Sequence, residues 1–202
     1  LAMDNFGDAF SINNLPANMV ERVEVYKGVL PIGLGADALG GAVNVITRKT
    51  ANYLDVSYSF GSFNTHKASI NGAYTNGKTG LTTRLTSFLN YSDDNYKVYV
   101  PIIDLESGQK LGNQWVKRFH DGYKSWGVRL ETGFVNRPFA DYLLAGIIVA
   151  GNDKDIQNGV VMDLVYGART TDSRSVIPML RYKKSDLFIE GLGLSFYGSY
   201  SD

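Results

Sequence analysis

Few residues of this chain combine a reactive side chain with a spacing that chemistry requires. Gly33, Gly35 and Ala38 match the G-x-G-x-x-A pattern of dinucleotide-binding loops, and they follow a strand-like stretch. In such loops a helix begins at the pattern, because its N-terminus holds the pyrophosphate. Gly40, Gly41 and the β-branched residues after them prevent a helix of useful length. We therefore interpret the glycines as residues of tight backbone turns.

Residues that commonly bind metals are equally sparse. Cysteine is absent, and the two histidines, His66 and His120, lie far apart without the spacing of a metal site. The acidic residues Asp93–Asp94, and Asp153 with Asp155, lack the glycine and glutamate spacing of an EF-hand loop. We predict that these side chains are solvated or interfacial, and that the protein has no metal and no cofactor.

Catalytic motifs are also missing. Serine, histidine and aspartate all occur, but the sequence contains no G-x-S-x-G nucleophile elbow. The chain is therefore predicted not to be an enzyme. A β-rich hydrolase is the weakest alternative, and hydrolysis of any member of a glycan or ester panel would revive it.

The composition narrows the possible partners. The 202 residues include 20 lysines and arginines and 20 aspartates and glutamates, so no basic excess is available to neutralise a nucleic acid. No stretch approaches the roughly 20 apolar residues of a membrane-spanning helix. A closed β-barrel can still cross a membrane, since its strands satisfy one another's backbone groups. The 22 glycines and 13 tyrosines suit strands and turns.

Alternation of apolar and polar residues predicts many β-strands. Two short strands are expected at residues 21–26 and 42–47, on either side of a glycine-rich turn. About seven longer strands follow, each near the ten residues that a tilted strand needs to span a bilayer. The long strands are predicted at residues 53–60, 67–74, 81–91, 126–134, 139–150, 176–183 and 192–200.

Two of the predicted long strands depart from clean alternation. Residues 139–150 are apolar on both faces, which indicates that the inner face also meets packed protein. Pro178 weakens residues 176–183 as a central strand, because proline cannot donate to the strand ladder.

Aromatic residues and connection lengths predict the environment of the strands. Long loops are expected at residues 92–125 and 152–175, tight turns at 136–138 and 184–186, and a hairpin at Asn76-Gly77. Long loops on one side and short turns on the other are typical of outer-membrane barrels, although the connection at 61–64 is an exception. Aromatic residues near strand ends fit an interfacial girdle, and they are Tyr53, Phe60, Tyr74, Tyr91, Trp126, Phe134 and Tyr200.

Residues 15–48 carry a resemblance to a known family. The stretch Leu15-Pro-Ala-Asn-Met-Val-Glu-Arg-Val-Glu-Val-Tyr-Lys-Gly28 resembles the end of the plug domain of TonB-dependent outer-membrane receptors. The stretch Gly35-Ala-Asp-Ala-Leu-Gly-Gly-Ala-Val-Asn-Val-Ile-Thr47 is similar to the run that follows in that family. Leu34 departs from the pattern, where the family often has an aromatic residue.

The resemblance implies the fold class and the function. Members of this family have a 22-stranded barrel closed by an N-terminal plug. A TonB-type energy-transducing protein acts on the plug, so that a scarce ligand such as an iron chelate, cobalamin or a glycan crosses the outer membrane. Residues 1–50 would be the C-terminal part of the plug domain. Residues 51–202 would be about seven N-terminal strands of the antiparallel transmembrane β-barrel.

The two ends of the chain support an expectation about its extent. The chain begins at Leu1 without a signal-peptide pattern, and it ends at Asp202 within a strand-like pattern. We interpret it as an internal part of a longer polypeptide, without the segment that binds the TonB-type partner.

Three groups of candidate site residues follow. Arg22 and Glu24 match the charged positions of the family's plug motif, so the resemblance implies that they contact the barrel. Four charged residues on the inward side of predicted strands would face the barrel lumen, and they are Lys67, Arg84, Arg129 and Glu131. The third group, in the first long loop, consists of the ligand-binding candidates Trp115, Phe119 and Tyr123.

A second interpretation of the same residues stays open. In a soluble β-sandwich the four inward charges would simply form the solvent face. The chain would then be an all-β binding or adhesion module that uses the aromatic residues of the loop at 92–125 for recognition. Aromatic strand ends and unequal loop lengths favour the barrel in the outer membrane.

Overall fold

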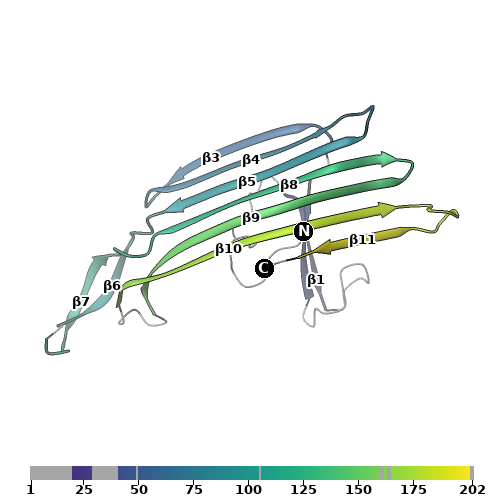
Figure 1. Cartoon of the computed structure of the whole chain (residues 1–202). Helices are drawn as coiled ribbons and strands as arrows, with labels where there is room; N and C mark the ends of the chain where they lie inside the picture. The colour runs from purple at the N-terminus through teal and green to yellow at the C-terminus, as the bar shows by residue number, and fades with distance from the viewer. Residues whose placement is uncertain are drawn as a thin grey trace.

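Antiparallel β-strands form the fold of the part that the computed structural model describes, which is residues 20–28, 41–48, 50–104, 106–159, 162 and 165–200 (Figure 1). Seven long strands pair in the spatial order β11-β10-β9-β8-β5-β4-β3. Every neighbouring pair in this sheet is antiparallel, which confirms the predicted all-β antiparallel class. The strands are β3 (Tyr53–Gly61), β4 (Thr65–Thr75), β5 (Leu81–Ser92), β8 (Tyr123–Arg137), β9 (Ala140–Asn158), β10 (Val165–Lys184) and β11 (Leu194–Ser199).

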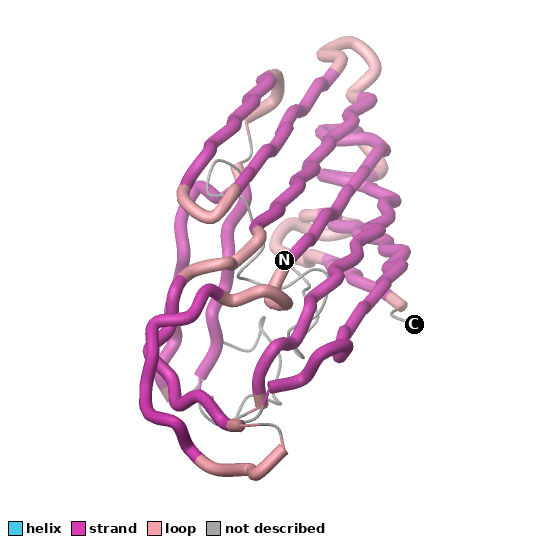
Figure 2. Tube along the Cα trace, turned by 90° about the vertical axis from the view of Figure 1, so that its left-hand side faces the viewer, coloured by secondary structure: helices cyan, strands magenta, loops and turns pink. Residues whose placement is uncertain are grey.

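The long sheet is open within the described residues, and its strands curve together (Figure 2). Its edges are β3 and β11. We call the end where β3 leads into β4 the loop end, and the end where β4 leads into β5 the turn end. In the described part of the chain, no helix is long and apolar enough to cross a membrane.

Two smaller antiparallel hairpins accompany the long sheet. Strands β1 (Val20–Lys27) and β2 (Gly41–Thr47) pair with each other, as the sequence predicts. In Figure 1, β1 lies across the direction of the long strands. Strands β6 (Lys97–Ile103) and β7 (Lys110–Lys117) form the second hairpin, which extends beyond the loop end.

The long sheet has two unlike faces because side chains alternate along each strand. We call the face with buried side chains the inner face; it includes Ser69, Asn71, Phe88, Ser125, Arg129, Glu131, Ile148, Ile177 and Met179. The opposite, outer face is apolar and exposed; it includes Leu54, Val56, Tyr58, Phe60, Leu85, Leu89, Val128, Leu130, Val176 and Leu180. The hairpin β1–β2 leads to the inner face, where Thr47 and Arg48 border a small cavity with Arg84 and Arg129.

An apolar cluster explains why residues 139–150 lack polar alternation. Ile148 and Ala150 of β9 are buried on the inner face, where they pack with Phe88, Ile177 and Met179. The inner side of β9 therefore contacts packed side chains, as its sequence predicts, while Ile147 on the outer side is exposed.

The prediction for Pro178 is wrong, because β10 pairs with β9 on one side and with β11 on the other. The carbonyl of Pro178 accepts a hydrogen bond from the backbone N–H of Tyr200, on the β11 side. In an antiparallel sheet the backbone nitrogen and the carbonyl oxygen of one residue point toward the same neighbouring strand. The proline nitrogen, which has no hydrogen to donate, therefore also points toward β11. There β11 ends at Ser199, and the ladder to β9 is unaffected.

Both predicted long loops contain strands, and one predicted tight turn is longer. Residues 92–125 include the hairpin β6–β7, and β9 and β10 continue through most of residues 152–175. The connection expected at 184–186 spans residues 185–193, since β11 begins at Leu194. Neither segment shows clean alternation, because β6 is apolar on both faces and the parts of β9 and β10 within residues 152–175 are mostly polar. The tight turn at 136–138 is confirmed, because β8 ends at Arg137 and β9 begins at Ala140.

The hairpin at Asn76-Gly77 is confirmed, with a five-residue connection between β4 and β5. The Asn76 side chain accepts hydrogen bonds from the backbone N–H groups of Lys78 and Thr79, at 2.9 and 3.1 Å. Gly80 closes the turn with a φ of +66°, a conformation that favours glycine.

One residue of the predicted aromatic girdle has a different place. Tyr53 shares the cavity at Arg84, so its side chain faces inward, and Arg48 lies over its ring at 5.4 Å. Tyr74, Tyr91 and Phe134 are exposed with the outer-face residues.

Candidate functional site

A buried ion network crosses three strands of the inner face. Glu131 on β8 accepts hydrogen bonds from two arginines, Arg129 on its own strand at 2.9 Å and Arg181 on β10 at 2.5 Å. The Arg129 and Glu131 side chains are only 8% and 6% exposed. A buried charge is tolerated when it is paired and hydrogen-bonded, so each arginine depends on this one carboxylate. We call these three residues the Glu131 network.

A glycine makes the network possible. Glu131 and Arg181 lie on β8 and β10, with β9 between them, and Gly146 of β9 is the strand partner of Glu131. A Cβ atom at Gly146 would lie 2.7 Å from Cγ of Glu131 and 3.2 Å from Cγ of Met179. The missing side chain therefore leaves the space through which Glu131 reaches Arg181.

Arg84, Arg129 and Glu131, predicted to face inward, lie together. Arg84 is the strand partner of Glu131 across β5 and β8, and all three residues line the small cavity beside Thr47. Both carboxylate oxygens of Glu131 are used by Arg129 and Arg181, however. Within the described residues, Arg84 forms no ion pair.

The fourth inward candidate, Lys67, is separate from this group. It borders a cavity of about 250 Å³ near the loop end, together with Tyr123, Asn90 and Ser92. Tyr123 was predicted as a loop residue, but it begins β8, and Nζ of Lys154 lies 5.8 Å from its ring centroid. The cavity has hydroxyl, amide, aromatic and ammonium groups, which suit a polar ligand.

The other two aromatic candidates lie outside that cavity. Trp115 on β7 is 68% exposed and contacts Tyr99 of β6, with ring centroids 5.4 Å apart. Phe119 follows β7 and is also exposed. The structure therefore places Tyr123 with Lys67, and Trp115 with Tyr99 on the projecting hairpin.

The base of the β6–β7 hairpin is held by buried polar contacts. The side-chain oxygen of Gln157 on β9 accepts hydrogen bonds from the backbone N–H groups of Phe119 and His120, at 2.7 and 3.1 Å. The buried Arg118 donates to the hydroxyl of Tyr96 at 2.7 Å and pairs with Asp121 at 3.1 Å. These contacts fix the hairpin relative to the long sheet.

Arg22 and Glu24, the predicted plug–barrel contacts, bind each other in the structure. Nε of Arg22 donates to Oε1 of Glu24 at 2.8 Å, and the hydroxyl of Tyr26 and the amide of Asn44 donate to Oε2. The hydrogen bond from Arg22, followed by that from Tyr26, lowers the pKa of Glu24 below its ordinary value of 4.5. Their contact with a barrel stays a prediction.

The side chains of the described segments form no group of three or more histidines, aspartates or glutamates that could hold a metal ion. His66 contacts Tyr58 at 2.7 Å through Nδ1 and Asn64 at 2.9 Å through Nε2. His120 lies on another part of the loop end, where its Nδ1 is 3.9 Å from Asp155. The glycine pattern at residues 33–38 falls outside the described residues.

Sequence reasoning missed Arg181, which completes the Glu131 network. Arg181 continues the inward alternation of Ser175, Ile177 and Met179 on β10, all of which are buried. That alternation could have predicted an inward-facing Arg181. It was not used, because Pro178 was interpreted as evidence against a central strand.

Part of the chain is similar in sequence to a known protein. The chain is similar to a ferric enterobactin receptor of Pseudomonas aeruginosa, with 37% identity over 89 residues. The match covers 44% of this chain and 11% of that receptor, so the similar region is a small part of the relative's length. No model of a known protein family matches the chain, and no solved structure matches it.

Proposed function

We propose that this chain is part of a TonB-dependent outer-membrane receptor, which binds a scarce ligand and imports it with energy from the inner membrane. Residues 1–50 are proposed to end the plug domain, and residues 51–202 to begin the barrel. The motif resemblance of residues 15–48 and the partial similarity to a ferric enterobactin receptor support this proposal. Among possible cargoes, that similarity favours an iron chelate over cobalamin or a glycan.

The observation that carries the proposal is the contrast between the two faces of the long sheet. The outer face exposes apolar side chains on successive strands, for example Leu54, Leu85 and Leu130, and Leu54 is 75% exposed. The inner face buries the charged Glu131 network. Water-soluble monomers rarely expose so continuous an apolar surface, whereas a barrel wall in lipid requires it.

The proposed partners follow from this arrangement. The outer face contacts the lipid bilayer, and the inner face lines the lumen. The cavity at Lys67 and Tyr123, with the exposed aromatic residues of the β6–β7 hairpin, offers the ligand polar and aromatic contacts from the outside of the cell. The TonB-type protein is the proposed energy-transducing partner, and it acts through the plug domain.

Neighbouring residues of β5 provide a matched test. Leu85 faces outward and Thr86 lines the small inner cavity, and the chain has no cysteine of its own. Spin labels on Leu85→Cys and Thr86→Cys variants of the intact protein in lipid vesicles should differ. We expect the label at 85 to collide mainly with lipid-dissolved oxygen, and the label at 86 to be relaxed by a water-soluble nickel chelate or shielded by protein.

A label at position 85 that reports bulk water would overturn the membrane assignment. Monodisperse, detergent-free behaviour of the intact protein with a cooperative thermal transition would point the same way. Both results would favour a soluble binding module that uses Trp115 and Phe119 for recognition.

A further inference from the structure

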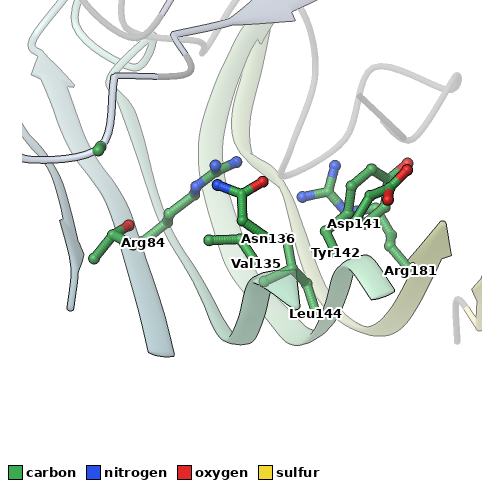
Figure 3. A pocket seen from close by; sticks show the side chains of 9 residues that line it. Arg84, Val135, Asn136, Asp141, Tyr142, Leu144 and Arg181 are labelled. Atoms are coloured by element: carbon green, nitrogen blue, oxygen red, sulfur yellow. The ribbon is translucent and has the colours of Figure 1, made fainter. Parts of the chain in front are cut away.

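A cavity of about 400 Å³ lies on the inner face near the turn end. Its lining includes Arg84, Asn136, Asp141, Tyr142, Leu144 and Arg181. Figure 3 shows the side chains of Arg84 and Arg181 extending toward this space from different sides. Here we propose a binding site for a small organic anion that carries carboxylate or phosphate groups.

Within the described residues, the two carboxylates nearest the cavity, Glu131 and Asp141, have partners other than Arg84. Glu131 uses one carboxylate oxygen for Arg129 and the other for Arg181. Asp141, the acidic residue of the lining, accepts hydrogen bonds from the backbone N–H and the hydroxyl of Ser185, at 2.9 and 2.7 Å. No carboxylate of the described residues pairs with Arg84, so an anion from outside can bind there.

Unused hydrogen-bond donors provide a second, independent observation. The Nε atoms of Arg129 and Arg181 are buried, and neither has a hydrogen-bond partner among the residues that the structure describes. Arg129 is more than nine-tenths buried and borders the smaller cavity, which it shares with Arg84. Buried polar groups are normally satisfied, and guanidinium donors match carboxylate and phosphate oxygens in geometry. Four arginines, Arg48, Arg84, Arg129 and Arg181, thus line the two adjoining cavities, where the carboxylates in the lining are Glu131 and Asp141.

The size and the remaining lining indicate the class of anion. A volume of about 400 Å³ lies in the range of small-molecule sites and far exceeds that of a single inorganic ion. Tyr142, Leu144 and Val135 supply aromatic and aliphatic contacts, and Asn136 supplies an amide. We therefore assign the site to an organic anion with a compact apolar part. The assignment rests on the proposed function, because the inner face must be the water-accessible side.

Citrate and inorganic phosphate are suitable probes, and the intact protein in detergent is the material to use. Isothermal titration calorimetry should show citrate binding that Arg84→Gln weakens at least about tenfold, as expected for loss of a charge-assisted hydrogen bond. Arg84→Lys should weaken it less, because a lysine keeps the charge but not the planar fork. Lys27→Gln is the matched control, since Lys27 is an exposed cation at the end of β1 and lines none of the three cavities described above, and citrate affinity should not change.

Three results would overturn the assignment. These are no citrate binding to the unmodified protein, equal losses in Arg84→Gln and Lys27→Gln, or phosphate binding as tight as that of citrate. The last result would indicate an inorganic oxyanion site. If Arg84→Gln does not fold, the test passes to Arg84→Lys. An unchanged citrate affinity in that variant would also overturn the assignment. The labels at positions 85 and 86 separate the two proposals: a lipid-facing position 85 without citrate binding ends only the anion site.

Discussion

Glu131 is one carboxylate that serves two buried or partly buried arginines on the inner face. Removing one partner of a buried ion pair costs more than the pair contributes, because the other charge stays buried without compensation. Exposed ion pairs behave differently, since water screens them and solvates the partner that is left. The chain contains both situations, and they can be compared directly.

We expect Glu131→Gln to lower the free energy of unfolding by about 3–5 kcal/mol, as for other broken buried pairs. The matched control is Asp153→Asn, which removes the exposed pair between Arg174 and Asp153 at 2.8 Å and should cost at most about 1 kcal/mol. Urea unfolding of the intact protein in detergent micelles measures both. Similar losses for the two variants would show that the Glu131 network is not a buried ion pair.

The pKa of Glu24 gives a prediction about pH. Hydrogen bonds from Arg22 and then Tyr26 lower it below the ordinary value of 4.5. The charged carboxylate is therefore favoured in the folded hairpin. Its stabilisation of β1–β2 is present above pH 4.5 and is lost as the pH falls through the lowered pKa.

Arg22→Gln should raise the pKa of Glu24 toward 4.5, because it removes the largest cause of the shift. An NMR titration of the Glu24 side-chain carboxyl carbon measures this. Lys27→Gln is the control, since Lys27 is not among the groups that shift Glu24, and it should leave the pKa unchanged. No response to Arg22→Gln would mean that the Arg22–Glu24 contact does not form in solution.

At the scale of elements, strand packing depends on where side chains are absent. Gly146 is the clearest case, because its backbone has an ordinary conformation and only the neighbouring atoms exclude a side chain. A Cβ atom there would lie 2.8 Å from the carbonyl oxygen of Leu130 as well as 2.7 Å from Cγ of Glu131. The backbone oxygen cannot move without disturbing the β8–β9 ladder.

Gly146→Ala should therefore destabilise the protein by about 1–3 kcal/mol, the usual cost of overpacking. Gly167→Ala, also in a strand, is the control, because its added Cβ would meet no atom within 4 Å. Combining Gly146→Ala with Glu131→Gln should cost less than the sum of the two, since both disturb the same contact. Fully additive losses in urea unfolding would separate Gly146 from the Glu131 network.

The success of sequence reasoning also differs between elements. Strands β3, β5 and β8 were predictable because Leu54, Leu85 and Leu130 alternate with polar residues, and one face of each strand is apolar. The hairpin β6–β7 was missed because β6 is apolar on both faces and contains Pro101, so it shows no alternation. The parts of β9 and β10 near the loop end were missed because most of their residues are polar on both faces. The inward direction of three charged side chains was predictable from strand alternation, and these are Arg84, Arg129 and Glu131. The contact between Arg181 and Glu131 was not predictable, because it passes through the space at Gly146, which the pattern of a single strand does not reveal.

For the molecule as a whole, the exposed apolar side chains of the outer face are the feature that depends most on the surrounding solvent or lipid. Its side chains are mostly apolar along β3, β4, β5 and β8 and along the turn-end parts of β9 and β10, as a wall in lipid requires. The penalty for a charge on such a wall depends on depth, being largest at the bilayer centre and small near the interface. In a soluble module, the penalty for a charge on this face would not depend on position along the strand in this way.

Leu130→Arg, at the centre of β8, should destabilise the intact protein in lipid vesicles by about 2–4 kcal/mol. Leu81→Arg, at the first residue of β5 near the turn end, should cost only about 0–1 kcal/mol. Guanidinium unfolding in vesicles, followed by tryptophan fluorescence, measures the difference. Equal effects at the two depths would contradict a membrane-spanning sheet.

Strands β9 and β10 contain 19 and 20 residues, roughly twice the number that a bilayer requires of a tilted strand. At about 3.4 Å per residue each reaches roughly 65 Å, so in the proposed setting about half of the β9–β10 pair lies beyond the hydrocarbon core of the bilayer. Such a projecting ribbon keeps its shape through its own backbone ladder. On a living cell it would present antibodies and bacteriophages with a rigid epitope rather than a pliable one.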